Sequence, residues 1–273
     1  MMRINLATHQ RLAMDKLRSG SILCGGVGSG KSRTSIAYYF CHECKGSIDE
    51  NGNIEEASRH PDLYIITTAK KRDSHEWEEE CKLFPLEDCR IVIDSWNNIK
   101  KYSDIKESFF IFDEQRLVGS GAWVKAFLKI AKSNNWILLS ATPGDTWSDY
   151  IPVFIANGFY KNRTEFTREH IVFSRFTKYP KIERYINTNA LEKYRSKVVV
   201  PMSVQRHTAR HYTDILSSYD KVIMNKVSKD RWNFETDRPI ENAGEACLLM
   251  RKVVNSDPSR LEFILDCLKL NKK

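Results

Sequence analysis

Five short apolar runs in the first 145 residues alternate with longer amphipathic stretches. Each run is continuous and is bounded by polar or turn residues, which is typical of a strand buried on both faces. Five such strands predict one sheet that is covered on both sides. The runs span residues 21–24, 63–66, 91–93, 109–112 and 136–139.

The stretches between these runs carry apolar residues at helical spacing. Strands that alternate with helices predict an α/β fold, a parallel sheet with helices on both faces. Residues 45–60 interrupt the alternation as an acidic, turn-rich loop. One predicted helix spans residues 122–131, and the others are marked by Ile36, Phe40, Cys44, Trp77, Cys81 and Phe84.

The alternation stops at about residue 160, and the chain then becomes basic. Residues 161–273 carry 23 Lys and Arg against 14 Asp and Glu, whereas residues 1–160 carry 20 against 21. We therefore expect one domain over residues 1–160 and a basic, mostly helical extension over residues 161–273. The positive charge indicates an anionic partner, with nucleic acid first, and a solvated basic surface is the alternative.

The 273 residues include no apolar run long enough to cross a membrane, and the first residues lack the apolar segment of a signal peptide. We therefore expect a cytoplasmic protein with no membrane partner. The seven cysteines, an odd number, are expected to be free thiols. Cys41 and Cys44 have the spacing of a zinc half-site, but no second ligand pair follows them, so zinc is not favoured.

A glycine-rich loop fits the pattern G-x-x-x-x-G-K-[ST] at every required position. It follows the first predicted strand and precedes the first predicted helix, which is the context that a phosphate-binding loop needs. The glycines let backbone N–H groups turn inward around a phosphate, and the helix start adds positive potential. A flexible turn is the alternative. The loop consists of Gly25, Gly26, Val27, Gly28, Ser29, Gly30, Lys31 and Ser32.

Charged and hydroxyl side chains in two motifs fit phosphoryl transfer. We expect Lys31 to reach the β- and γ-phosphates of ATP, and Ser32 to supply a hydroxyl to Mg²⁺. Asp113 and Glu114 follow a buried strand, where adjacent carboxylates are costly without a cation. We expect Asp113 to hold the same Mg²⁺ and Glu114 to orient and deprotonate the attacking water. A solvated acidic turn is the alternative.

A third motif, Ser140-Ala141-Thr142-Pro143, ends the last predicted strand. Small hydroxyl residues at a strand end can form hydrogen bonds to the neighbouring acidic pair and respond to the γ-phosphate. Ser140, Ala141 and Thr142 are therefore expected to couple the nucleotide to the rest of the protein. The four residues alone are a common turn sequence. Their position after the two preceding motifs makes the functional interpretation more specific.

The order of the three motifs, GGVGSGKS, DEQR and SATP, resembles the first RecA-like lobe of superfamily-two helicases and translocases. Within that superfamily the chain is most similar to Swi/Snf-type ATPases in a compact, bacteriophage-like form. The resemblance implies a RecA-like P-loop NTPase lobe, ATP and Mg²⁺ as cofactors, and hydrolysis coupled to movement on DNA. A bacteriophage protein of this kind would act in the host cytoplasm.

Weaker matches extend the resemblance along the chain. His9-Gln10 resembles the N-terminal glutamine motif, which implies that Gln10 reads the adenine edge. Residues 67–70 resemble motif Ia, and residues 77–80 resemble the W-x-x-E helix that follows it. Residues 247–255 resemble the segment that leads into the second lobe of the family.

The resembled family has a second RecA-like lobe that supplies arginine fingers to the same ATP. Residues 205–210 resemble the arginine motif only superficially and come too early for a whole second lobe. We therefore expect weak ATP hydrolysis by this chain alone. The chain is either a natural half, whose missing lobe comes from a second chain, or a truncated product.

The segment 161–210 holds 12 Lys and Arg against four Asp and Glu. Aromatic residues are interleaved with these charges, and they either stack on unpaired bases or pack beneath the charges. We expect contacts with the DNA backbone and little sequence preference. The expected DNA-binding residues are Lys178, Lys181, Arg184, Arg195 and Lys197, and the resemblance adds Lys70 and Lys71. The aromatic residues are Tyr160, Phe166, Phe173, Phe176, Tyr179, Tyr185 and Tyr194.

Two functions from different classes fit these features. The first is the ATP-binding lobe of a DNA-dependent ATPase, helicase or translocase. The second is a non-catalytic module that binds DNA or a protein when nucleotide is present. A P-loop kinase is a third possibility, and the Ser-Ala-Thr-Pro motif argues against it. Turnover of ATP with and without DNA distinguishes the first function from the second.

Overall fold

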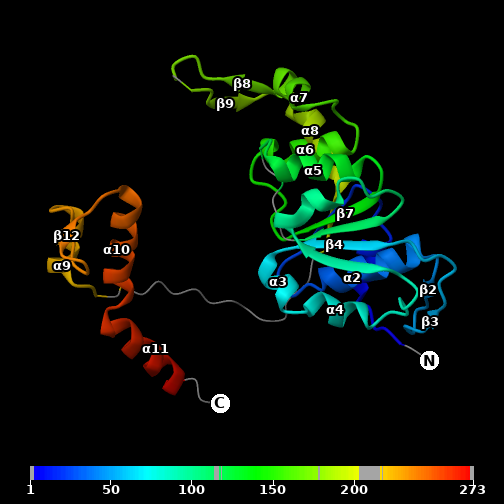
Figure 1. Cartoon of the computed structure of the whole chain (residues 1–273), viewed down its shortest axis with the longest axis horizontal. Helices are drawn as coiled ribbons and strands as arrows, with labels where there is room; N and C mark the ends of the chain where they lie inside the picture. The colour runs from blue at the N-terminus through cyan, green and yellow to red at the C-terminus, as the bar shows by residue number, and fades with distance from the viewer. Residues whose placement is uncertain are drawn as a thin grey trace. The chain divides into compact units, whose positions relative to one another are not determined.

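The chain folds into two compact units, Met1–Gln205 and Arg206–Lys273, and each is described by itself (Figure 1). Each unit has a hydrophobic core of its own. The computed structural model describes residues 3–113, 117, 119–177, 179–202, 216 and 218–270.

The first unit is built on a six-stranded parallel sheet in the order β10-β1-β7-β6-β4-β5. Five strands coincide with the five apolar runs, which confirms the predicted α/β fold. Because all six strands are parallel, their carboxyl ends lie at one edge of the sheet. The strands are β1 (Ile22–Cys24), β4 (Leu63–Thr67), β5 (Ile91–Ser95), β6 (Phe109–Asp113), β7 (Asn135–Ser140) and β10 (Val199–Pro201).

Helices cover both faces of this sheet, as the sequence predicts. Neighbouring residues of a strand point to opposite faces, so Phe109 and Ile111 belong to one core cluster, and Phe110 and Phe112 to the other. All four side chains are fully buried. The first face is covered by α1 (Thr8–Met14), α2 (Lys31–Tyr38) and α4 (Glu76–Cys81), and the second by α5 (Ala122–Ala131) and α6 (Ile151–Ala156).

Short elements connect the strands and helices. The expected loop over residues 45–60 contains a small antiparallel hairpin, because two residues on each side of the Asn51-Gly52 turn pair with each other. The connecting elements are η1 (Tyr39–Glu43), β2 (Ser47–Ile48), β3 (Ile54–Glu55), α3 (Ala69–Asp73), η2 (Trp96–Tyr102) and η3 (Trp147–Tyr150).

The first unit continues well beyond residue 160, where the sequence placed its boundary. Strand β10 pairs in parallel with β1, and the next residue, Met202, is 2% exposed. The basic segment therefore completes the sheet, and the expected boundary falls inside the unit. Strand β10 has only three residues and follows a long segment outside the sheet, so hydrophobic periodicity gives little indication of it. This segment contains α7 (Arg163–His170), β8 (Ile171–Phe173), β9 (Ile182–Tyr185) and α8 (Thr188–Val198).

The second unit is small and mostly helical. Its core comprises Val227, Ile240, Ala246 and Leu249, with Phe234 and Met250 packed against them. The sequence predicts the helical character but not the short hairpin. The elements are α9 (Lys221–Ser228), β11 (Trp232–Asn233), β12 (Arg238–Pro239), α10 (Ala243–Asn255) and α11 (Pro258–Leu270).

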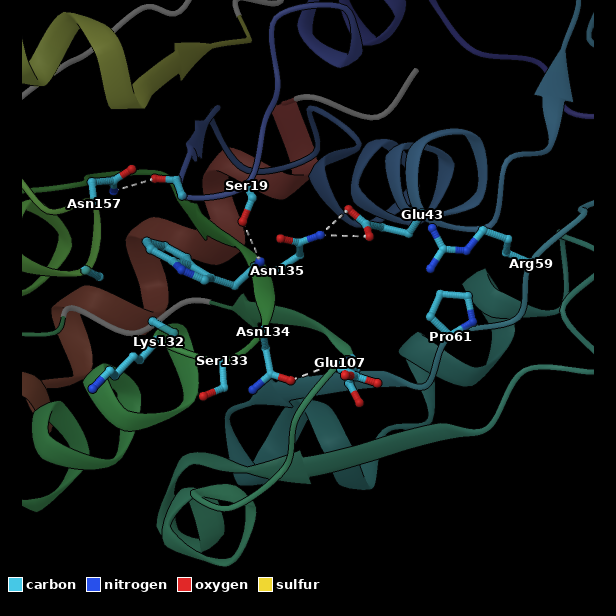
Figure 2. Close-up of a pocket in the computed structure, with 15 residues that line it drawn as sticks. Ser19, Glu43, Arg59, Pro61, Glu107, Lys132, Ser133, Asn134, Asn135 and Asn157 are labelled. Atoms are coloured by element: carbon cyan, nitrogen blue, oxygen red, sulfur yellow. Dashed lines mark hydrogen bonds between the residues drawn. The ribbon is translucent and has the colours of Figure 1, made fainter.

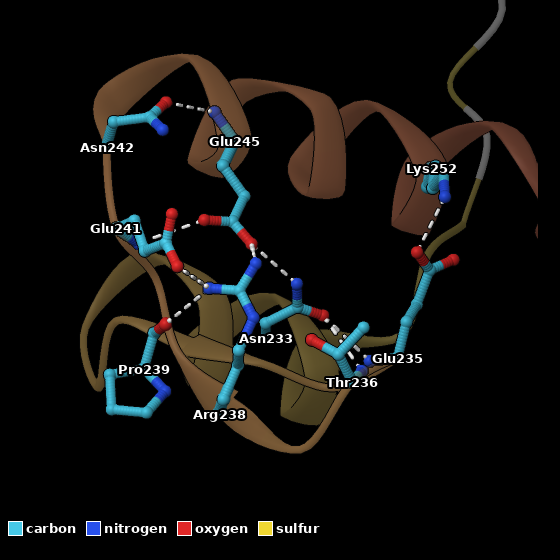
Figure 3. Close-up of polar contacts among 9 residues, drawn as sticks. All are labelled: Asn233, Glu235, Thr236, Arg238, Pro239, Glu241, Asn242, Glu245 and Lys252. Carbon is cyan, nitrogen blue, oxygen red and sulfur yellow. Dashed lines mark hydrogen bonds and ion pairs between the residues drawn. The ribbon is translucent and has the colours of Figure 1, made fainter.

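Polar contacts attach the hairpin of the second unit to helix α10 (Figure 3). Glu245 accepts a hydrogen bond of 2.7 Å from Asn233 and pairs with Arg238 at 2.9 Å. Hydrogen bonds from the Glu241 backbone and from Asn233 hold the pKa of Glu245 below its usual value. Asn242 caps the helix by accepting from the Glu245 amide at 2.9 Å. These contacts fix a hairpin that has too few residues to be stable alone.

All seven cysteines are free thiols in the described part of the chain. No group of three or more His, Cys, Asp or Glu residues there is placed to hold a metal ion. No helix among the described residues has the length and apolar character needed to cross a membrane.

Candidate nucleotide-binding site

The glycine-rich loop joins β1 to α2 at the carboxyl edge of the sheet, where the sequence predicts it. Gly28 and Gly30 have φ angles of +75° and +81°, a backbone conformation that side chains disfavour. At Gly25 an added Cβ would lie 2.6 Å from the Ser29 hydroxyl, which leaves no room for a side chain. The conformation of the loop thus explains three of its four glycines.

The loop presents positive potential without a side-chain cap. Helix α2 begins at Lys31, and its N-cap residue Gly30 makes no side-chain hydrogen bond. The first amides of the helix are therefore available to an anion. The Lys31 ammonium donates to the carbonyls of Gly25 at 2.7 Å and Gly26 at 3.0 Å, so the cation is held over the loop itself.

Two residues of helix α1, His9 and Gln10, contact the loop. Gln10 is 7% exposed, accepts from the Ala7 amide at 2.8 Å and donates to the Gly30 carbonyl at 3.2 Å. The His9 ring lies 3.1 Å from the Ser29 carbonyl. Both polar ends of the Gln10 amide thus contact backbone, and its contact with adenine stays a prediction. The sequence did not predict that His9 would contact the loop.

The segment before the second unit contacts the residues that flank the loop, Cys24 and Thr34. The Met202 amide donates to the Cys24 carbonyl at 2.7 Å, and the Thr34 hydroxyl lies 3.5 Å from the Met202 sulfur. Burial raises the pKa of the Cys24 thiol, and the charge of Lys31 offsets part of that rise. Cys24 therefore stays protonated at neutral pH beside the loop.

Asp113 ends β6 at the same edge of the sheet and is 1% exposed. Its Oδ2 atom accepts from the Thr67 hydroxyl at 2.8 Å and from the Trp77 indole at 3.2 Å, and it pairs with the Lys71 ammonium at 2.9 Å. Its Oδ1 atom is buried and has no hydrogen-bond partner within the described ranges. A buried, unpartnered carboxylate oxygen is an unusual and costly feature unless a cation can reach it.

Ser32 and Lys71 line one cleft of about 480 Å³, together with Trp77. Asp113 does not line this cleft itself, but Lys71, which does, pairs with its carboxylate. Carboxylate and hydroxyl oxygens are ligands that Mg²⁺ accepts. The Ser32 hydroxyl and the unpartnered Oδ1 of Asp113 have the chemistry of Mg²⁺ ligands, and the Mg²⁺ site that they would form stays a prediction.

The third motif lies next to the loop. The carbonyl of Ser140, at the end of β7, accepts from the Gly25 amide at 3.1 Å. The Ser140 hydroxyl accepts from the Thr142 amide at 3.1 Å, and no hydrogen bond joins it to Asp113 among the residues the structure describes. Ala141 and Thr142 are exposed. The backbone of the motif thus contacts the loop, and its coupling role stays a prediction.

Two of the predicted residues, Glu114 and Lys178, lie outside the described residues. The other expected DNA contacts fall on three elements. Lys70 is exposed on α3, and the hairpin of β8 and β9 carries Lys181 at its turn and Arg184 on β9. The remaining two, Arg195 and Lys197, lie on α8.

Three of the expected DNA contacts also interact within the protein. Lys71 pairs with Asp113, so its ammonium lies at the carboxyl edge of the sheet, and its contact with DNA stays a prediction. The Arg195 guanidinium lies 5.4 Å from the Trp147 ring centroid, and the Lys197 ammonium lies 5.9 Å from that of Tyr194. A cation that stacks on an aromatic ring keeps its charge and can still contact a phosphate of the DNA backbone.

A separate polar hollow of about 600 Å³ lies at the opposite ends of the strands (Figure 2). The Asn135 amide donates to both carboxylate oxygens of Glu43, at 3.1 and 3.3 Å. The Asn134 amide is likewise bonded to the Ile105 and Ile130 carbonyls. These side chains close the amino ends of β6 and β7, and they are remote in the fold from the phosphate loop.

The ion pair of Lys71 and Asp113 is expected to stabilise the fold. Lys71→Met would leave the Asp113 carboxylate buried without its cation, and breaking a buried pair costs about 3–5 kcal/mol. The Lys71 side chain is 19% exposed, so we expect a loss of about 2–4 kcal/mol in the free energy of unfolding, measured with urea. Lys70→Met, one residue away on an exposed position, should change it by less than about 0.5 kcal/mol. Equal stability of the two variants would contradict this role.

The sequence matches no protein-family model and no curated protein. Among solved structures, the Sulfolobus solfataricus SWI2/SNF2 ATPase core in complex with dsDNA aligns with a TM-score of 0.52 and 17% identity. The alignment covers 73% of this chain and 45% of that one, so this chain spans less than half of that core.

Two further structures are similar at lower scores. The Sulfolobus solfataricus SWI2/SNF2 ATPase core domain has a TM-score of 0.49 and 16% identity, over 93% of this chain and 57% of that one. The Pyrococcus furiosus Hef helicase domain has a TM-score of 0.37 and 13% identity, over 61% of this chain and 40% of that one. With its parallel sheet and helices on both faces, the first unit has the RecA-like α/β fold found in the SWI2/SNF2 ATPase core.

Proposed function

We propose that this chain contains the ATP-binding lobe of a DNA-dependent ATPase of the helicase or translocase type. The observation that carries the proposal is the meeting of two motifs at one edge of the sheet. The phosphate loop follows β1, and Asp113 ends β6 with a buried oxygen that lacks a partner in the described structure. A solvated acidic turn would not bury this carboxylate.

Each residue of the edge has a defined part in nucleotide binding. The loop amides and the start of α2 receive the phosphates, and the Lys31 ammonium moves from the loop carbonyls to the β- and γ-phosphate oxygens. Ser32 and Asp113 hold Mg²⁺, which neutralises charge on the β- and γ-oxygens when it is bound. Glu114 accepts the proton of the water that attacks the γ-phosphate.

The proposed enzyme needs a cation opposite the loop. This chain spans 45% of the length of the SWI2/SNF2 core that it resembles in fold. We propose that a second RecA-like lobe, carried by another segment or another chain, faces the γ-phosphate. Action on DNA in a host cytoplasm, as in a bacteriophage, follows from the sequence resemblance alone.

The proposed activity is tested by two measurements on the same protein. Titration with a fluorescent ATP analogue in Mg²⁺ reports binding, and phosphate release with and without duplex DNA reports turnover. Binding with DNA-stimulated turnover supports the ATPase, particularly if a second lobe added in trans raises the rate. Absence of nucleotide binding by the wild-type chain would overturn the proposal.

The alternative is a nucleotide-gated binding module without turnover. The pairing of Lys71 with Asp113 favours it, because a lysine at 2.9 Å competes with Mg²⁺ for the same carboxylate. Such a module would bind DNA or a protein partner more tightly with ATP than without it. A nucleotide-dependent affinity with no turnover, even after addition of a second lobe, would favour the module over the ATPase.

The proposed DNA contacts are electrostatic and independent of sequence. Reversing Lys181 and Arg184 to Glu should weaken binding to all duplex sequences alike. It should also reduce the slope of log affinity against log salt by about 0.9 for each phosphate that the protein no longer neutralises. Anisotropy of labelled duplexes at several salt concentrations measures this. The matched control is Lys132→Glu, which reverses the charge of an exposed lysine at the opposite edge of the sheet. A wild-type slope of log affinity against log salt near zero would contradict electrostatic binding to the DNA backbone.

A further inference from the structure

The hairpin of β8 and β9 projects from the first unit beyond α7 and α8 (Figure 1). Its strands are antiparallel, with Ile171 opposite Tyr185 and Val172 opposite Arg184. The Ser174 amide donates to the Lys181 carbonyl at 2.9 Å and continues the pairing toward the turn. The hairpin therefore carries its turn away from the sheet that holds the nucleotide site.

The base of the hairpin is fixed to the body of the unit. The His170 ring is 2% exposed and lies 2.6 Å from the Tyr160 hydroxyl and 3.0 Å from the Ile186 carbonyl. The Tyr185 hydroxyl lies 2.8 Å from the Ser148 hydroxyl. These contacts, at the residue before β8 and at the end of β9, hold the base of the hairpin against the body of the unit.

The aromatic residues of the basic segment include a buried group and a largely exposed group, with Phe173, Tyr185 and Tyr194 between them. Tyr160 and Phe166 are 6% and 0% exposed and belong to the core. Phe176 and Tyr179, on either side of the turn, are 97% and 75% exposed. Packing beneath the charges thus explains the first group but not the second, whose large apolar surfaces face water at an energetic cost.

Positive charge surrounds the two exposed rings. Arg175, Lys181 and Arg184 are exposed, and none of them makes an ion pair with the residues the structure describes. Glu183 is the one acidic residue in the described part of residues 171–185. Aromatic faces flanked by cations match a polyanion that also offers flat rings, and single-stranded nucleic acid has both properties.

We propose that the turn of this hairpin binds unpaired bases next to a duplex, with Phe176 and Tyr179 stacking on them. The proposal rests on the DNA binding proposed above and names the form of DNA that the hairpin recognises. Bases inside a duplex already stack on each other and expose only their edges, so the two rings need a frayed end, a fork or a single strand. Arg175 and Lys181 then contact the phosphates that flank those bases.

The test compares a forked DNA with a blunt duplex of the same paired sequence, using the full chain. The fork carries 2-aminopurine at its first unpaired position, whose fluorescence is quenched when a ring stacks on it. We expect the wild type to bind the fork more tightly and to quench the probe. The double variant Phe176→Ala, Tyr179→Ala should lose about tenfold or more in fork affinity and lose the quenching, while its duplex affinity stays unchanged.

Two control variants separate stacking from other effects. Phe176→Tyr combined with Tyr179→Phe keeps both rings and should retain the preference for the fork. Phe263→Ala removes another exposed ring, 42% exposed on α11, and should change neither affinity. Thermal unfolding checks that each variant is folded.

The possible outcomes distinguish this inference from the proposed function. Wild-type protein that binds duplex and fork equally, with no effect of the double alanine variant, overturns the stacking role and leaves DNA binding in place. Wild-type protein that binds neither DNA overturns the DNA-binding proposal itself. Loss of fork and duplex affinity together in a folded double variant also overturns the proposal, because stacking on unpaired bases predicts an effect on the fork alone.

Discussion

Lys31→Ala is expected to abolish the binding of Mg-ATP while leaving the fold intact. The lysine provides the side-chain cation of the loop, and hydrogen bonds from a charged donor contribute about 1.5–3 kcal/mol each. Loss of such bonds to two phosphate groups should weaken binding by at least about 100-fold. Titration with a fluorescent ATP analogue measures the affinity.

The fold of this variant should survive because the two hydrogen bonds that Lys31 donates to the Gly25 and Gly26 carbonyls lie within the loop and not in the hydrophobic core. The Gly26 carbonyl can bond to water instead because Gly26 is exposed, whereas the carbonyl of the buried Gly25 loses one hydrogen bond. Lys132→Ala, an exposed lysine at the opposite edge of the sheet, is the matched control and should keep wild-type affinity. Wild-type affinity in the Lys31 variant would refute the site.

The fold was predictable because its strands are buried on both faces. A strand such as β6, with four fully buried residues in sequence, needs an apolar run that no surface segment would carry. Strand β10 escaped prediction as part of this sheet. Only three residues long, it pairs with β1 from 177 positions along the chain. Its contribution depends on tertiary pairing, which local periodicity does not encode.

The site was predictable to the extent that its chemistry is local in sequence. The phosphate loop is one continuous segment, so its pattern identifies it. The surroundings of Asp113 are not local, because Thr67, Lys71 and Trp77 come from another strand and from helices that follow it. The sequence assigned Lys71 to DNA from its place after motif Ia, whereas the structure places its ammonium on Asp113. The pair of Lys71 and Asp113 joins residues 42 positions apart, and neither local sequence pattern indicates it.

The second large effect concerns turnover. The protein comprising residues 1–273 is expected to bind Mg-ATP and to hydrolyse it slowly, with or without DNA. In the proposed site it supplies the loop, Asp113 and Glu114, and the proposed partner lobe supplies the cation that faces the γ-phosphate. Arginine fingers contribute about 10³–10⁵ in rate to phosphoryl transfer, equivalent to about 4–7 kcal/mol of barrier.

Glu114→Gln separates this slow turnover from contamination by another ATPase. Replacing the carboxylate by an amide removes the proposed base for the attacking water and leaves the proposed phosphate contacts in place. Affinity for Mg-ATP should therefore change little, while the residual rate falls to background in a phosphate-release assay. Asp113→Asn should instead weaken the dependence of nucleotide binding on Mg²⁺, because Asp113 is the proposed ligand. DNA-stimulated hydrolysis by residues 1–273 at the rate of a complete translocase would contradict the need for a second lobe, and would mean that Arg116, Arg206 or a second copy of the chain provides the cation.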